Sequence, residues 1–161
     1  MRCAVTTPSH LELLRLLSRH GVPFVVIGGH AVSFHGHIRA TEDVDLIWLR
    51  SPEAENTLLG ALQEAHAQWI ADEIDPATGI EQLVPVTLPY IRSSHLMMLV
   101  TDFGFLDLFD YVPGYPDTDP QQLFSESILS DQIRYVSLQW LEQMKKTSGR
   151  AQDQADLKNL D

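Results

Sequence analysis

Cysteine and long apolar runs are both scarce in this chain. Its 161 residues include one cysteine, Cys3, which excludes a disulfide or a cysteine-rich zinc site within one chain. No stretch approaches the roughly 18 consecutive apolar residues that cross a bilayer, and the N-terminus has no apolar segment of signal-peptide type. We therefore expect a cytoplasmic protein that does not contact a membrane.

Basic residues are also few, with 11 Lys and Arg against 22 Asp and Glu and a formal net charge of −11. A surface of this charge repels phosphate backbones, so we expect no extended nucleic-acid surface. A nucleotide held through a metal ion, or one tRNA end at a local basic patch, is compatible with it. The length fits one domain over residues 1–161, with a sheet-containing part over about 1–112 and a helical part over about 119–161.

A short strand that ends in a glycine turn is predicted early in the chain. β-branched and aromatic residues form the run Phe24–Ile27, between Pro23 and the pair Gly28-Gly29, and such a run predicts a buried strand. Glycine has no Cβ, so the backbone at this pair can adopt unusual dihedrals or approach a ligand closely.

Two carboxylates are paired on a second predicted strand, over residues 43–48. Side chains two residues apart on a strand share a face, so Asp43 and Asp45 point the same way while Val44 points the other way. Like charges about 7 Å apart repel unless a cation lies between them, and Mg²⁺ prefers carboxylate and phosphate oxygens. A metal site is one explanation of the pair, and a solvated edge face is the other.

Arg39 precedes the paired acids by four residues. Its guanidinium would balance their charge or bind a nucleotide phosphate as a bidentate donor. A surface ion pair with Glu42 is an equally good explanation of this residue.

A β-hairpin is predicted over residues 95–111, with its turn at Asp-Phe-Gly. On its second strand Asp107 shares a face with Phe105 and Phe109. An acid in the middle of an apolar strand is costly to bury without a partner, so Asp107 is the candidate for a third carboxylate. Asp110 is the competitor, but it lies on the opposite face near a Pro-Gly pair, where an ordinary loop acid is expected.

Capping patterns predict the helices. Ser9 opens a capping box and a helix that stops at Gly21, and Ser51-Pro52 begins a helix to about His66. The rest of the chain is expected to form an edge strand at 68–71, an edge or broken strand within 83–91, a helix at about 120–128, a short strand at 133–136, a helix capped by Ser137 and a last helix at 152–160. 

Charged residues mark the junction of the last two predicted helices. Lys145 and Lys146 end one helix, and Asp153 and Asp156 lie in the first turns of the next. These positions suit the helix dipoles, which is a sufficient explanation of the four residues when they are considered alone.

The order Gly-Gly-x-Ala, seven residues, Arg-x-Thr-x-Asp-x-Asp, which runs from Gly28 to Asp45, resembles the nucleotidyltransferase superfamily that includes DNA polymerase beta. It looks closest to the small prokaryotic branch of AbiEii-type toxins and minimal nucleotidyltransferases. The resemblance implies that the glycine turn holds a triphosphate and that the paired acids hold a metal ion. Many members have serine where this chain has His30, so the phosphate contact would come from backbone N–H groups.

Two later segments extend the resemblance. Residues 103–108 match Phe-Gly-x-Leu-Asp-Leu, the context of the family's third acid, and residues 141–157 match Leu-x-x-x-Lys, then Gly-Arg, then Asp-x-x-Asp-Leu. By this resemblance Lys145 reaches the triphosphate or base pocket, and Asp153 and Asp156 orient the basic residues. The implied site has Asp43, Asp45 and Asp107 as catalytic and metal-binding residues, and Gly28, Gly29, His30, Arg39, Thr41, Lys145 and Arg150 as nucleotide-binding residues.

The expected fold is α/β, a mixed sheet flanked by helices, with C-terminal helices closing a cleft. The resemblance implies transfer of a nucleoside monophosphate from an NTP such as ATP, with Mg²⁺ or Mn²⁺, to a hydroxyl of a tRNA end, a protein or a small molecule. It also implies a toxin–antitoxin component and a protein partner as further expectations. The alternatives are a catalytically inactive nucleotide-binding or partner-binding protein of the same fold, and an interaction module with a large apolar patch.

Overall fold

The computed structural model describes residues 8–74 and 76–160, so Cys3 lies outside it. Within these ranges the chain forms, in order, α1 (Pro8–Arg19), β1 (Phe24–Ile27), α2 (Gly28–Phe34), β2 (Asp43–Trp48), α3 (Pro52–Glu64), β3 (Gln68–Ile74), β4 (Glu81–Pro85), α4 (Leu88–Ser93), β5 (Leu96–Thr101), β6 (Gly104–Phe109), α5 (Pro120–Ser125), β7 (Ile128–Ser130), β8 (Ile133–Tyr135), α6 (Leu138–Ser148) and α7 (Ala151–Leu160).

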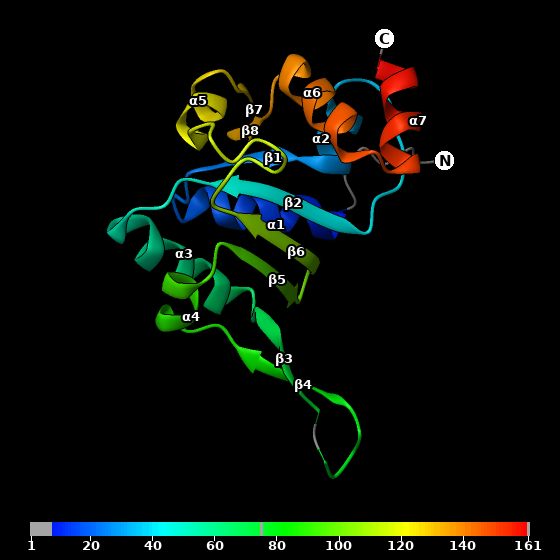
Figure 1. Ribbon diagram of the computed structural model, residues 1–161. Helices are drawn as coiled ribbons and strands as arrows, with labels where there is room; N and C mark the ends of the chain where they lie inside the picture. The colour runs from blue at the N-terminus through cyan, green and yellow to red at the C-terminus, as the bar shows by residue number, and fades with distance from the viewer. Residues whose placement is uncertain (1–7, 75, 161) are drawn as a thin grey trace.

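The strands of the described residues form one open mixed sheet in the order β4-β3-β5-β6-β2-β1-β8-β7 (Figure 1). The pairs β2–β6 and β1–β8 are parallel, and the other neighbours are antiparallel. In this register Asp45 lies opposite Ile27 of β1 on one side and opposite Asp107 of β6 on the other. The middle of the sheet therefore brings the glycine turn and all three candidate acids together.

Helices cover the two faces of the sheet unequally. One face is covered by α1, α3 and α4, and α6 and α7 lie on the other side, near the ends of β1 and β2 (Figure 1). On the first face Val44, Leu46, Leu106 and Leu108 are fully buried. This is the α/β fold expected from the sequence, with the C-terminal helices beside the strands that carry the acids. No helix within residues 8–74 and 76–160 is long and apolar enough to cross a membrane.

Several local signals gave the correct element ends. The hydroxyl groups of Ser51 and Ser137 accept hydrogen bonds from the backbone N–H groups three residues later, at the starts of α3 and α6. Gly21 follows α1 with a φ of +83°, as a helix stop requires. The capping box at Ser9 was wrong, because α1 already begins at Pro8 and Ser9 lies inside its first turn.

Several elements outside the central strands differ from the sequence prediction in their ends or in their place in the sheet. The strand expected at 68–71 at an edge instead runs to Ile74 and lies between β4 and β5, so β4 is the edge strand. Pro89 does not break a strand but lies in the first turn of α4, a helix that Thr87 caps. The helix expected to reach about Ile128 ends at Ser125, and the chain returns as β7 and β8. The C-terminal part is therefore not only helical, because it adds two strands to the sheet.

Candidate active site

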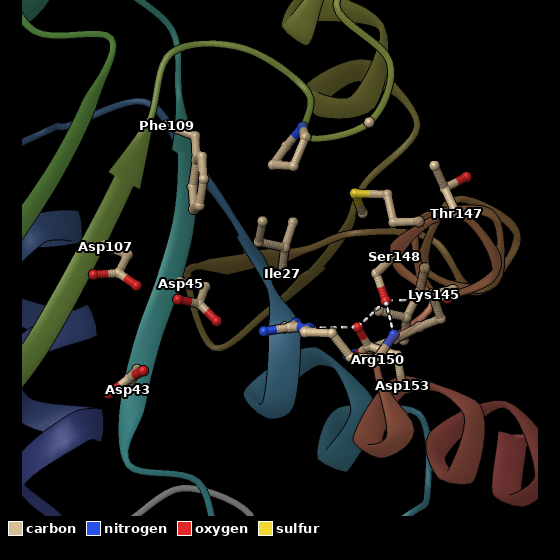
Figure 2. Close-up of a pocket in the computed structure, with 15 residues that line it drawn as sticks. Ile27, Asp43, Asp45, Asp107, Phe109, Lys145, Thr147, Ser148, Arg150 and Asp153 are labelled. Atoms are coloured by element: carbon tan, nitrogen blue, oxygen red, sulfur yellow. Dashed lines mark hydrogen bonds and ion pairs between the residues drawn. The ribbon is translucent and has the colours of Figure 1, made fainter.

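Three carboxylates converge on one face at the centre of the sheet. Asp43 and Asp45 lie two residues apart on β2, and parallel pairing places Asp107 directly beside Asp45. Each of the three residues offers one carboxylate oxygen, and these oxygens all lie within 4.8 Å of one another. Figure 2 shows the three side chains along the two strands, on the side of the pocket opposite α6 and α7. The sequence placed the first two on a common face, and the structure adds the third.

The acids perturb one another. Burial and then the neighbouring charge of Asp107 raise the pKa of Asp45 to about 7, because both disfavour the ionised form of the Asp45 carboxyl group. Burial is also the main reason that the pKa of Asp107 is raised. Hard oxygen donors at this spacing suit a divalent cation, which removes the repulsion. The triad is therefore compatible with divalent metal binding.

Gly28 is fitted closely against the triad. Its φ is +68°, a region that L-residues rarely adopt. A Cβ at this position would lie 2.3 Å from Asp45 Oδ2, which is far inside van der Waals contact. The residue thus needs glycine both for its backbone conformation and for the space that Asp45 occupies.

Gly29 packs against the loop that leads into β2. A Cβ there would lie 2.7 Å from Thr41 Oγ1 and 3.2 Å from Arg39 Nη1. The hydroxyl of Thr41 in turn donates a hydrogen bond to the backbone carbonyl of Asp43 at 3.1 Å. Side chains at the glycine pair would therefore displace both an acid and the loop that positions the other acid.

A buried lysine faces the acids from the C-terminal helices. Lys145 on α6 has a side chain only 6% exposed, and its ammonium lies 2.6 Å from Asp153 Oδ1 and 3.2 Å from Asp156 Oδ2. Burial alone would raise the pKa of Asp153, but hydrogen bonds from Lys145, Ser148 and Arg150 outweigh it and lower this pKa. The two α7 aspartates therefore both bind the ammonium group of Lys145.

Arg39 is bound to α7 and not to its neighbour in sequence. Its Nε and Nη2 donate to Asp156 Oδ1 and Oδ2 at 2.9 Å and 3.0 Å, a bidentate pair with a fully buried carboxylate. The expected alternative, a surface pair with Glu42, was wrong. The pairing ties the 39–42 loop to the C-terminal helix, so both sides of the cleft share one charged network.

The acids and the basic residues line two adjoining cavities. One cavity, of about 300 Å³, lies between the triad and α6 and is lined by Gly28, Lys145 and Arg150 among others. The other, of about 280 Å³, is also lined by Gly29 and the 39–42 loop. In Figure 2 the exposed Arg150 extends from the turn between α6 and α7, and its Nε donates to Asp153 at 2.9 Å. The site residues predicted from the sequence that line these two cavities are Gly28, Gly29, Arg39, Thr41, Asp43, Asp45, Asp107, Lys145, Arg150 and Asp153.

His30 lies elsewhere. Its side chain is fully buried, and its Nε2 lies 2.9 Å from Nδ1 of His10, which α1 contributes. It lines neither cavity, so in this arrangement its imidazole faces the interior while its backbone remains beside the glycine pair. His10 was not recognised in the sequence because a histidine on an apolar helix carries no local functional signal. Ser148, whose hydroxyl donates to Asp153, was also missed, because a serine at the end of a helix carries no local functional signal.

Asp110 has a structural role in this fold. Its carboxylate is 7% exposed and accepts a hydrogen bond from Arg50 Nε at 2.8 Å, while Arg50 also binds Glu55 at 2.7 Å. The choice of Asp107 as the third acid agrees with this geometry. The expectation that Asp110 is an ordinary loop acid was wrong, because the Arg50 network buries it.

Comparison with known proteins shows the fold and little beyond it. No family model matches the chain, and no curated protein does. The "putative nucleotidyltransferase" of Thermotoga maritima aligns with a TM-score of 0.57 at 17% identity, over 96% of this chain and 93% of that one. JHP933 from Helicobacter pylori (TM-score 0.51, 18% identity, 98% and 67% covered) and an antigenic nucleotidyltransferase-like protein from Paracoccidioides brasiliensis (0.51, 18%, 92% and 70%) are also similar. The protein thus has the mixed α/β fold of nucleotidyltransferase-like proteins.

Proposed function

We propose that this protein is a cytoplasmic Mg²⁺-dependent nucleotidyltransferase, which transfers a nucleoside monophosphate from an NTP to a hydroxyl group. The observation that carries the proposal is the convergence of three carboxylates within 4.8 Å beside a glycine turn and opposite buried and exposed cations. Charge of both signs at one cavity suits a substrate with a polyanionic tail and a bound metal ion.

The residues divide into three groups by their place around the cavity. Asp43, Asp45 and Asp107 would hold Mg²⁺ or Mn²⁺, and the metal ion when bound would offset charge on the phosphates and on the leaving group. Lys145 and Arg150 face the triad from the other wall and would bind phosphate oxygens by charge-assisted hydrogen bonds. Gly28 and Gly29 also line the second cavity, where backbone N–H groups would donate hydrogen bonds to a phosphate.

The transfer needs no covalent enzyme intermediate. The oxygen of the acceptor hydroxyl forms a bond to the α-phosphorus, and the bond from that phosphorus to the oxygen bridging to the β-phosphate breaks. Pyrophosphate leaves with the electron pair of that bond, and the hydroxyl proton passes to a carboxylate or to water. Asp107, the third acid of the family resemblance, would be the carboxylate that takes this proton. The acceptor is a tRNA end, a protein or a small molecule.

A catalytically inactive nucleotide-binding or partner-binding protein is the second candidate. Two observations favour it: His30 occupies the position of the family's serine with its side chain buried, and Lys145 is already engaged by two aspartates. The transferase and an inactive nucleotide-binding protein both predict binding of an NTP and a divalent cation, so the two differ only in product formation.

The test is transfer of label from each of the four α-³²P-labelled NTPs in Mg²⁺, with total tRNA, the protein itself and a polyol mixture as acceptors. We expect a labelled product with the wild type and none with Asp43→Ala/Asp45→Ala. Asp117→Ala, which changes an exposed acid outside both cavities, is the matched control and should keep full activity. Mg²⁺-dependent NTP binding without any product would favour the inactive candidate, and equal binding by the double variant would contradict both.

A toxin–antitoxin role belongs to the same proposal and rests on the sequence resemblance to the AbiEii-type branch. Controlled expression in a bacterial host tests it. We expect growth arrest with the wild type and normal growth with Asp43→Ala/Asp45→Ala at equal protein levels. Equal growth of the two strains, with transfer activity intact in vitro, would remove this role and leave the chemistry unaffected.

A further inference from the structure

The sheet face that carries the triad continues as an apolar surface across β6, β5, β3 and β4. Residues paired across strands share a face, and Asp107 pairs with Met98, whereas Phe105 pairs with Val100. The register then places Ile70 and Leu83, which pair with each other, on this same side. We call the surface formed by Ile70, Leu83, Leu96, Met98, Val100 and Phe105 the β3–β6 face.

No helix of the described residues covers the β3–β6 face (Figure 1). Phe105 is 52% exposed, Met98 58% and Leu83 47%, whereas Met97 and Leu99, which alternate with them on β5, are buried under the helices of the opposite face. Five of the nine large hydrophobic side chains that are exposed among the described residues lie on this one face: Ile70, Leu83, Leu96, Met98 and Phe105. Apolar side chains gathered on one surface in this way mark an interaction site.

We propose that the β3–β6 face is a docking surface for a polypeptide segment that carries apolar side chains together with Lys or Arg. The four strands contain no Lys or Arg at all. The charged groups of the face are carboxylates, because the triad of β2 and β6 lies at its inner border. A partner with cations beside its apolar residues matches both properties of the surface.

The same charges argue against the other occupants of an apolar face. Nucleic acid and anionic lipid headgroups need basic residues at the surface, and these strands provide none. A second copy of the chain would use the same patch on both subunits, which would bring two acidic triads toward each other. A basic and apolar peptide is the occupant that gains from the carboxylates.

The surface and the cavities meet at Asp107 but lie on different sides of it. The cavities extend from Asp107 toward α6, Lys145 and Arg150, whereas the β3–β6 face extends from Asp107 toward β4. A docked segment therefore leaves the cavities open and lies within reach of the triad. The inference does not depend on the proposed transferase activity, since binding of the segment requires no chemistry.

The test is selection of peptides from a phage-displayed random dodecapeptide library with the purified protein as bait. Synthetic copies of the enriched peptides are then titrated by fluorescence anisotropy. Two pairs of variants give matched controls: Met98→Gln with Leu129→Gln, both 58% exposed in the wild type, and Ile70→Lys with Ile128→Lys, 43% and 42% exposed. The control residues lie on β7, at the opposite edge of the sheet.

We expect enriched peptides that combine apolar residues with Lys or Arg. Their affinity should fall about tenfold or more with Met98→Gln and Ile70→Lys and stay unchanged with the two β7 variants. Circular dichroism and Mg²⁺-dependent NTP binding by all four variants show whether fold and cavities are intact. Enrichment of acidic peptides, no enrichment, or equal loss with the β7 variants would overturn the proposal. A dimer in sedimentation that Met98→Gln dissociates would assign the face to a second copy and overturn it as well.

Discussion

Replacing Gly28 by alanine tests whether the glycine turn positions the triad. The new Cβ would lie 2.3 Å from Asp45 Oδ2 and 3.1 Å from Asp45 Cβ, so Asp45 or the start of α2 must move. The backbone also has to hold alanine at a φ of +68°. Two separate costs therefore arise, one from the backbone conformation and one from the contact with the acid.

The size of each cost can be estimated. An L-residue in the left-handed region costs about 1–2 kcal/mol, and forcing extra volume into a packed site costs about 1–3 kcal/mol. We expect Gly28→Ala to lower the free energy of unfolding by about 2–5 kcal/mol in total. Gly21→Ala is the matched control, because its φ is +83° with no atom within 4 Å of the added Cβ, so it should cost only about 1–2 kcal/mol.

Urea unfolding measures the stability term, and electron paramagnetic resonance of Mn²⁺ measures the metal site. Displacement of Asp45 should weaken Mn²⁺ binding by Gly28→Ala about tenfold or more, which corresponds to about 1.4 kcal/mol. Gly21→Ala should bind Mn²⁺ as the wild type does. Equal stability loss in the two variants, together with unchanged Mn²⁺ affinity, would refute the reasoning that Gly28 and Asp45 are coupled.

Three further predictions separate electrostatic from structural roles. In the metal-free protein the pKa of Asp45 is about 7, whereas in the unfolded chain it is near 3.8. The folded state therefore binds more protons between these two pH values, and its stability falls as the pH rises through this window. Asp45→Asn should flatten that fall when thermal unfolding is measured as a function of pH. Lys145→Met leaves two buried aspartates short of a cation and should cost about 3–5 kcal/mol in urea, against about 0.5 kcal/mol or less for the exposed Lys146→Met. Asp110→Asn should lower the free energy of unfolding by about 1–3 kcal/mol and leave Mn²⁺ affinity unchanged. Asp107→Asn should abolish Mn²⁺ binding without loss of stability. The opposite pattern would make Asp110 the metal-binding acid and Asp107 the structural one.

Much of the local structure could be predicted from the sequence. The caps at Ser51 and Ser137 work through hydrogen bonds to residues three positions later, so no distant part of the chain is needed to recognise them. The hairpin of β5 and β6 was recognised for the same reason, since its turn and its alternation are both local. The elements that were missed, α4 and β7, are short, and short segments carry weak periodicity.

The candidate site was predictable only to the extent that strand geometry is periodic. Because side chains on a strand alternate, the spacing of Asp43 and Asp45 places them on one face, and the same rule separates Asp107 from Asp110. Their convergence also requires β2 and β6 to be neighbours, which pairing of remote segments decides. The resemblance to a known family supplied that neighbour relation in advance, and the residues alone did not.

The sequence by itself determined the faces of the strands, the ends of most helices and the glycine that a tight turn needs, because these depend on residues within a few positions. Tertiary structure alone decided that Arg39 pairs with Asp156 across 117 positions, that Lys145 is buried, and that the β3–β6 face stays uncovered. A long basic side chain can pair with any of several carboxylates, and only the packing of distant helices and strands determines which carboxylate lies within reach.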